Sequence, residues 1–311
     1  MYLYHFGLSE LPFTLTPNTH FFLALEPHDE ALAVLITALK TGEGFIKVTG
    51  EVGTGKTLIC RKLLNEIPEH FVTAYIPNPY LKPDELRRAL AVELGIKQAQ
   101  NMSAQLLTQR IQSQLLTLHS QGHSVVLILD EAQALPAESL EALRLFTNLE
   151  TETRKLLQVV LFAQPELDQR LEKKEFRQLY QRITFSYQLR SMNSAEVEQY
   201  IHHRLQVAGY KGALLFSAAL CKKITKASNG IPRLVNVLCH KMLMLSYGEG
   251  GYKITKNQLN AAVKDTESIH HKHKKNGSMN TVKMIMLTVA ANVLVIMLMY
   301  FVYSFYFSGA A

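Results

Sequence analysis

The stretch GEVGTGKT, residues Gly50–Thr57, decides the fold, because it fits the pattern G-x-x-x-x-G-K-[ST] at every constrained position. It follows the apolar run GFIKVT (44–49) and opens the helical pattern KTLICRKLLNEI (56–67). A strand, a glycine-rich loop and a helix in this order are the setting that a phosphate-binding loop requires. Glycine-rich loops also form ordinary turns, but the Lys-Thr pair in this setting favours phosphate binding.

Each part of this loop has a physical role in binding a nucleoside triphosphate. Gly53 and Gly55 allow the backbone to fold back, so that its N–H groups converge on phosphate oxygens at the positive end of a helix. The Lys56 ammonium would neutralise phosphate charge, and the Thr57 hydroxyl would ligate Mg²⁺. We therefore predict that ATP and Mg²⁺ are the cofactors. The predicted nucleotide-binding residues are Gly50, Glu51, Val52, Gly53, Thr54, Gly55, Lys56, Thr57 and Asp130.

A second, acidic motif supplies the other half of such a site. In VVLILDEAQ (125–133), Asp130 ends an apolar strand pattern, where a carboxylate that holds Mg²⁺ is expected. Thr57 and Asp130 are therefore the predicted metal ligands. Glu131 follows directly and could orient an attacking water, which favours hydrolysis over nucleotide holding alone. The sequence offers no reactive serine, Cys–His pair or metal-ligand cluster as a competing catalytic centre.

Strand-like and helical patterns alternate through the first 190 residues. The strand-like runs are GFIKVTG (44–50), FVTAYIP (71–77), SVVLILD (124–130), LLQVVLFAQ (156–164) and ITFSYQL (183–189). Helical patterns such as PDELRRALAVELGI (83–96) and PAESLEALRLFTNLE (136–150) lie between them. This alternation predicts an α/β fold with a mostly parallel sheet and helices on both faces. From about residue 191 the pattern becomes helical, and SAEVEQYIHHRLQVAG (194–209) begins with a predicted serine cap.

The region after residue 265 differs in composition from the rest of the chain. Its basic part holds Lys272, Lys274, Lys275 and Lys283, four of the residues behind a net charge of +7. The uncharged run 284–307, MIMLTVAANVLVIMLMYFVYSFYF, would measure about 36 Å as a helix, enough to cross the ~30 Å core of a bilayer. Basic residues before a span favour the cytoplasmic side. The predicted domains are an α/β domain (1–190), a helical domain (191–265), a basic linker (266–283), a membrane span (284–307) and a short tail (308–311).

Two further features agree with a cytoplasmic body. Residues 1–13 lack the basic start and the apolar run of a signal peptide. Cys60, Cys221 and Cys239 form no CxxC pair and show no zinc-site spacing, so we expect three buried thiols.

Several motifs in this order resemble those of AAA+ ATPases. They are the glycine-rich loop, LDEAQ (129–133), FAQPEL (162–167), RQLYQRITFSYQL (177–189) and NGIPRLVN (229–236). The segments MYLYHFGLSELPFTLTPNTHFFL (1–23) and HDEALAVLITAL (28–39) resemble the ExeA/GspA group, which serves type II secretion, and within it the ATPases of MSHA pilus biogenesis. The resemblance covers about residues 1–265. It implies a P-loop NTPase fold of the AAA+ type, followed by a small all-α lid domain.

The resemblance also implies further catalytic residues. Gln164 is similar to sensor 1, the polar residue that contacts the γ-phosphate, although a plain strand-end glutamine would look the same. Arg233 resembles sensor 2, which the lid brings to the phosphates. Arg182 resembles the arginine finger offered to a neighbouring subunit's ATP, with Arg177 as the alternative and a structural salt bridge open for either. Asn78 resembles the switch residue that restrains the catalytic glutamate, but an asparagine between prolines also makes a good turn.

The same resemblance implies a place and partners for the chain. We expect a homo-oligomer in the inner membrane, with a periplasmic C-terminus, that works with pilus or secretion-system proteins. Members of the group carry a peptidoglycan-binding domain after their span, and residues 308–311 are too few to form one, so direct binding of the cell wall is not expected. Two alternatives are a nucleotide-switched DNA-binding protein of the transposition-helper type and a scaffold that binds ATP with little turnover. The span and the concentration of charge beside it speak against a nucleic-acid partner.

Overall fold

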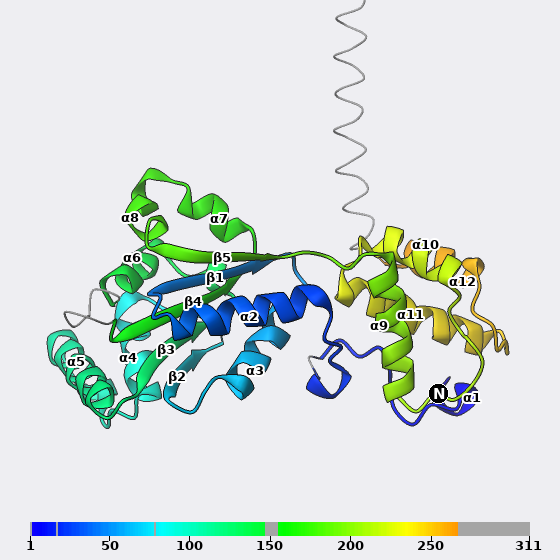
Figure 1. The fold of residues 1–311 in the computed structure, drawn as a ribbon. Helices are drawn as coiled ribbons and strands as arrows, with labels where there is room; N and C mark the ends of the chain where they lie inside the picture. Colours follow the sequence, from blue (N-terminus) through cyan, green and yellow to red (C-terminus); the bar gives the residue numbers. More distant parts are fainter. Residues whose placement is uncertain (1, 17, 78, 147–154, 267–311) are drawn as a thin grey trace, which may run out of the picture. The chain divides into compact units, whose positions relative to one another are not determined.

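The computed structural model describes residues 2–16, 18–77, 79–146 and 155–266 (Figure 1). The predicted span (284–307) and tail lie outside these residues, as does the linker from residue 267 on. Within the described residues, no helix combines the length and the apolar character needed to cross a bilayer. Contacts divide the chain into one compact unit that ends at Ile254 and a second that begins at Thr255. The described part of the second unit is helix α12 (Lys256–Lys264), which Thr255 caps.

Five strands of the first unit form one parallel sheet in the order β2-β3-β4-β1-β5. The strands are β1 (Phe45–Gly50), β2 (Phe71–Ile76), β3 (Ser124–Leu129), β4 (Leu157–Ala163) and β5 (Ile183–Leu189). Each of the five strand-like runs forms a strand, so the predicted parallel sheet is confirmed. The order places β1, which leads into the glycine-rich loop, in the interior of the sheet between β4 and β5.

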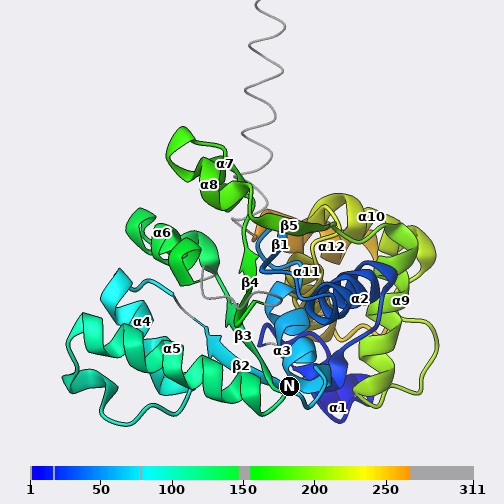
Figure 2. The ribbon, with the colours of Figure 1, turned by 60° about the vertical axis from the view of Figure 1, so that its left-hand side comes forward.

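Helices cover both faces of this sheet (Figure 2). Ile46 and Val48 of β1 face the side covered by α2 and α3, whereas Phe45 faces the side covered by the helices from α4 to α8. Alternate residues of a strand point to opposite faces, so this single strand contributes to two core layers. The helices before and between the strands are α1 (Tyr2–Phe6), α2 (Glu26–Lys40), α3 (Lys56–Glu66), α4 (Pro83–Glu93), α5 (Ala104–Ser120), α6 (Ala137–Phe146), α7 (Glu166–Leu171) and α8 (Arg177–Tyr180). The short 3-10 helices are η1 (Thr19–Phe21), η2 (Ala99–Asn101), η3 (Ala132–Ala134) and η4 (Lys174–Phe176).

Three helices of the first unit follow β5, and we refer to them as the lid: α9 (Ser194–Val207), α10 (Ala218–Ser228) and α11 (Pro232–Gly248). The predicted serine cap of α9 is wrong by one residue. Asn193 is the N-cap, because its side chain accepts hydrogen bonds from two backbone N–H groups while Glu196 bonds back to the Asn193 N–H. This reciprocal pair satisfies more of the unpaired donors at the helix start than a serine alone could. The division at residue 254 keeps the lid with the sheet, so the predicted boundaries at 190 and 265 stay predictions.

The N-terminal segment before α2 packs on the lid helices. Tyr2 Oη lies 2.9 Å from Nδ1 of His240 on α11, and the Ser9 hydroxyl donates to the Ala208 carbonyl at 2.8 Å. The Arg204 guanidinium on α9 donates to the carbonyl of Pro12. The lid helices therefore pack against the N-terminal segment of the same unit.

The three cysteines are buried thiols, as predicted. Burial raises the pKa of Cys60 and raises that of Cys221 to about 12. Both thiols therefore stay protonated at neutral pH and pack as small apolar groups.

Candidate nucleotide-binding site

The glycine-rich loop connects the carboxyl end of β1 to the start of α3. Gly53 and Gly55 have φ angles of +83° and +104°, in the region that side-chain-bearing residues rarely adopt. Gly53 also touches the lid, because a Cβ built on it would lie 2.5 Å from Arg233 Cβ. The loop therefore needs glycine at position 53 for its backbone and for the approach of α11.

Lys56 begins α3 with its ammonium group turned back over the loop. Its Nζ donates to the carbonyls of Gly50 and Glu51, at 2.8 and 3.0 Å. The side chain is 5% exposed, and burial lowers its pKa, against the attraction of Glu131 and Asp130. A phosphate group at this position would compensate a positive charge that two carbonyl oxygens now hold.

Asp130 and Thr57 meet beside this ammonium. Asp130 follows β3, is 2% exposed, and accepts hydrogen bonds from the Thr57 hydroxyl and from the Glu131 N–H. Burial raises the pKa of Asp130, while these hydrogen bonds oppose the rise. A carboxylate and a hydroxyl in direct contact are oxygen ligands of the kind that Mg²⁺ takes, so the pair fits the metal predicted for it.

Glu131 follows Asp130 directly and has its own set of hydrogen-bond partners. Its φ of +54° is uncommon for a residue with a side chain and marks local backbone strain. Its carboxylate oxygen Oε2 accepts hydrogen bonds from Nε2 of Gln133 at 2.5 Å and from Nε2 of Gln164 at 3.0 Å. Gln164 therefore contacts the predicted catalytic glutamate directly.

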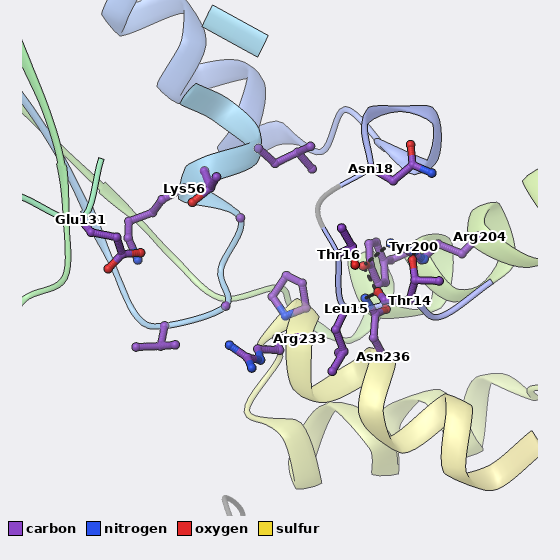
Figure 3. Close-up of a pocket in the computed structure, with 16 residues that line it drawn as sticks. Thr14, Leu15, Thr16, Asn18, Lys56, Glu131, Tyr200, Arg204, Arg233 and Asn236 are labelled. Atoms are coloured by element: carbon purple, nitrogen blue, oxygen red, sulfur yellow. Dashed lines mark hydrogen bonds between the residues drawn. The ribbon is translucent and has the colours of Figure 1, made fainter. Parts of the chain in front are cut away.

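A cavity of about 220 Å³ runs from this cluster to the lid. Figure 3 shows Lys56 and Glu131 together at one end, Arg233 between, and Asn236 and Arg204 at the other end. The remaining lining residues are Thr14, Leu15, Thr16, Asn18, Val52, Gly53, Gly55, Thr57, Leu58, Tyr200 and Pro232. A chain of phosphates would occupy the end near Lys56, which leaves the lid end for a sugar and a base.

A buried hydrogen-bond network forms the lid end of the cavity. The Tyr200 hydroxyl donates to Oδ1 of Asn236 and accepts from the Arg204 guanidinium, both at 3.0 Å. Asn236 Nδ2 donates to the Thr14 carbonyl at 3.2 Å. The guanidinium also lies 4.6 Å from the centre of the Phe21 ring, which provides a cation–π contact for a buried charge. These contacts fix the N-terminal segment across the cavity.

Arg233 stands where α11 meets the loop. Its backbone N–H donates to the Gly53 carbonyl at 3.2 Å, and its exposed side chain lines the cavity. The N-terminal end of a 17-residue helix therefore faces the site, where its partial positive charge favours an anion. The position agrees with the sensor 2 role expected of Arg233, which remains a prediction.

The other predicted site residues lie outside the cavity. The half-buried Arg182 donates to the Arg144 carbonyl at 3.4 Å, and Arg177 is exposed at the start of α8. Neither arginine lines the cavity, as is expected of a finger that serves a neighbouring subunit. Asn78 lies outside the described residues.

The sequence interpretation missed three kinds of residue. Gln133 belongs to the motif LDEAQ (129–133), and an amide two residues after the predicted catalytic carboxylate is within reach of it. His28 packs behind the loop, with Nε2 3.3 Å from the Thr54 carbonyl, and carries no sequence signal. In the sequence, Tyr200 and Asn236 look like ordinary helix residues. Their hydrogen bond depends on how α9 packs against α11, which the sequence pattern does not reveal.

Fold and site together resemble those of P-loop ATPases of the AAA+ type. Residues 39–171 match the family model described as AAA domain. A curated relative, General secretion pathway protein A of Aeromonas hydrophila, is 42% identical over 269 residues. The alignment covers 86% of this chain and 49% of that protein, so the chain spans about half the length of this relative.

Solved structures share the fold at low sequence identity. The Cdc6p protein of Pyrobaculum aerophilum superposes with a TM-score of 0.59 at 16% identity, over 80% of this chain and 71% of that one. A Walker-type ATPase of Pyrococcus abyssi gives 0.56 at 15% identity, over 85% and 80%. The Aeropyrum pernix ORC2 protein gives 0.56 at 16% identity, over 80% and 72%. These similarities establish the fold and carry no argument about what the chain binds.

Proposed function

We propose that the chain binds ATP with Mg²⁺ in the cavity and hydrolyses it. The observation that carries this proposal is that Lys56, Thr57 and Glu131 line one end of the cavity, with Asp130 next to Thr57. A phosphate-binding loop alone would support binding. The carboxylate of Glu131 at the cavity wall adds a group that can act on a water.

Each residue has a separate task in this reaction. Lys56 would exchange its carbonyl contacts for phosphate oxygens, and the loop N–H groups would bind the same phosphates. Thr57 and Asp130 would hold Mg²⁺, whose charge offsets that of the phosphates. Glu131 would orient the water and accept its proton, while Gln164 and Arg233 would contact the γ-phosphate as sensors. Arg182, or Arg177 in its place, would complete the site of a neighbouring subunit in a homo-oligomer.

Two variants test this assignment. Lys56→Ala should weaken ATP binding, because it removes the charge that faces the phosphates. Glu131→Gln should bind ATP as the wild type does and lose turnover, because an amide cannot accept the proton of the water. The measurements are nucleotide titration and steady-state phosphate release with the full chain in detergent. Wild-type turnover by Glu131→Gln would contradict the role given to Glu131.

We further propose that the ATPase is anchored in the inner membrane, with its body in the cytoplasm, and supports an envelope machine. The 42% identity to a protein named for the general secretion pathway supports a secretion-related role. The likeness to the MSHA pilus biogenesis protein MshM supports a type IV pilus more specifically and rests on the sequence motifs. The predicted span (284–307) supports the anchor.

Reporter fusions at Ala311 test the topology. A reporter active only in the periplasm should give signal, and one active only in the cytoplasm should not. The opposite pattern would remove the single-pass anchor and leave the ATPase assignment in place. A pull-down from detergent-solubilised membranes should recover pilus or secretion-system proteins.

A further inference from the structure

We propose that Gln133 is a positioning residue that aims the Glu131 carboxylate at the cavity and links it to the end of β4. This inference rests on the proposed hydrolysis for its effect on rate. The contacts of Gln133 themselves do not depend on that function. Three sets of contacts hold the Gln133 side chain and backbone.

The first contact holds the catalytic carboxylate. Gln133 Nε2 donates to Oε2 of Glu131 at 2.5 Å, and Gln164 Nε2 donates to the same oxygen at 3.0 Å. Because both amides use Oε2, the other oxygen, Oε1, would remain as an acceptor for a water. Glu131 lines the cavity in this arrangement, so the bonds hold it near the reacting position.

The second contact fixes Gln133 to the neighbouring strand. Its Oε1 accepts a hydrogen bond from the backbone N–H of Gln164 at 2.9 Å. Gln164 is the first residue after β4, and β4 pairs with both β3 and β1. One side-chain amide therefore uses its donor on the glutamate and its acceptor on the strand end, which leaves it a single orientation.

The third contact fixes the Gln133 backbone to α7. The Arg170 guanidinium donates to the Gln133 carbonyl at 2.7 Å. Asp168 of the same helix pairs with Lys47, a buried residue of β1. The helix is thus attached both to the turn that carries Glu131 and to the strand that leads into the phosphate-binding loop.

These contacts give the positioning role a physical reason. Glu131 has a φ of +54°, so its backbone alone does not favour this orientation. Hydrogen bonds from two amides of fixed orientation restrict the side chain to one direction. Hydrogen bonds to charged groups are stronger than those between neutral groups, so losing the one from Gln133 should slow turnover by about tenfold to a hundredfold.

Two substitutions of Gln133 distinguish the positioning role from a purely structural one. Gln133→Glu keeps the length and an acceptor for the Gln164 N–H, but it replaces the donor to Glu131 with a carboxylate oxygen that repels the Glu131 carboxylate. Gln133→Met keeps the volume and loses both. Gln169→Met is the matched control, because Gln169 is an exposed glutamine on α7.

The measurements are kcat, KM, the dissociation constant for ATP and hydrogen exchange at the Gln164 amide in nucleotide-free full-length protein. We expect both Gln133 variants to lose kcat by about tenfold or more, with ATP affinity unchanged. Exchange at Gln164 should be faster in Gln133→Met and unchanged in Gln133→Glu.

Three results would overturn the proposal. They are wild-type kcat in Gln133→Glu, a loss of ATP affinity equal to the loss of kcat, or wild-type exchange at Gln164 in Gln133→Met. A wild-type chain without ATPase activity would instead overturn the proposed hydrolysis. The exchange measurement would then still decide whether Gln133 holds the strand end.

Discussion

Replacing Gly53 with alanine tests how the lid meets the phosphate-binding loop. The added Cβ would lie 2.5 Å from Arg233 Cβ, a separation that requires one of the two backbones to move. A shift large enough to relieve it would stretch the 3.2 Å hydrogen bond from the Arg233 N–H to the Gly53 carbonyl. The substitution should therefore push α11 away from the loop.

The magnitude follows from three separate costs. An alanine at φ +83° costs about 1–2 kcal/mol, overpacking costs about 1–3 kcal/mol, and the lost hydrogen bond costs about 0.5–1.5 kcal/mol. Gly42 is the matched control, since it has the same φ of +83° and no atom within 4 Å of a built Cβ. Gly42→Ala should carry only the first cost, so Gly53→Ala should be less stable than Gly42→Ala by about 1.5–4.5 kcal/mol.

The assay is denaturant unfolding followed by far-UV circular dichroism, because the chain has no tryptophan. Arg233→Gly removes the opposing Cβ and should recover at least about 1 kcal/mol of the Gly53→Ala loss in a double-mutant cycle. Arg233→Ala keeps that Cβ and should recover none. Equal losses for Gly53→Ala and Gly42→Ala, or a Gly53→Ala loss that Arg233→Gly leaves unchanged, would refute the reasoning.

Three further predictions use other parts of the site. Burial lowers the pKa of His28, so as the pH falls the unfolded chain binds a proton at His28 before the folded chain does. The free energy of unfolding of the wild type should therefore decrease relative to that of His28→Gln below about pH 6.5. Unfolding measured between pH 8 and about 5.5 tests this. Tyr200→Phe should destabilise the chain by about 1–3 kcal/mol, because it leaves buried Arg204 and Asn236 groups without their shared hydroxyl; an unchanged midpoint would contradict this. Mixed Arg182→Ala and Lys56→Ala chains should regain ATPase activity, because some interfaces then join an intact loop to an intact finger, whereas mixed oligomers without activity would exclude Arg182 as that finger.

The sheet and the loop could be predicted because their signals are local. Each strand is a short apolar run with its own boundaries, and Gly50–Thr57 carries its glycines, lysine and threonine within eight residues. The parallel arrangement then follows from the alternation with helices. The contact of Thr57 with Asp130 could also be expected, since both belong to motifs of the same site.

Other features needed information that the patterns do not give. Asn193 and Ser194 are both good cap residues, and only the glutamate at position 196, three residues after Asn193, identifies the capping pair. The bonds of Gln133 to Gln164 and Arg170 join positions more than thirty residues apart in sequence. Their meeting depends on β3 and β4 lying side by side, which sequence periodicity does not reveal.

Different sets of hydrogen bonds hold the two ends of the cavity, so we expect substitutions at the two ends to have different effects. At the phosphate end, Glu131 is held by side chains that follow β3 and β4, so changes there should alter the rate of turnover. At the lid end, Tyr200 and Asn236 hold the N-terminal segment through the Thr14 carbonyl, so changes there should alter affinity. Gly53 and Arg233 join the two ends through a single backbone hydrogen bond. A substitution at this junction should therefore change turnover and affinity together, which distinguishes it from substitutions at either end.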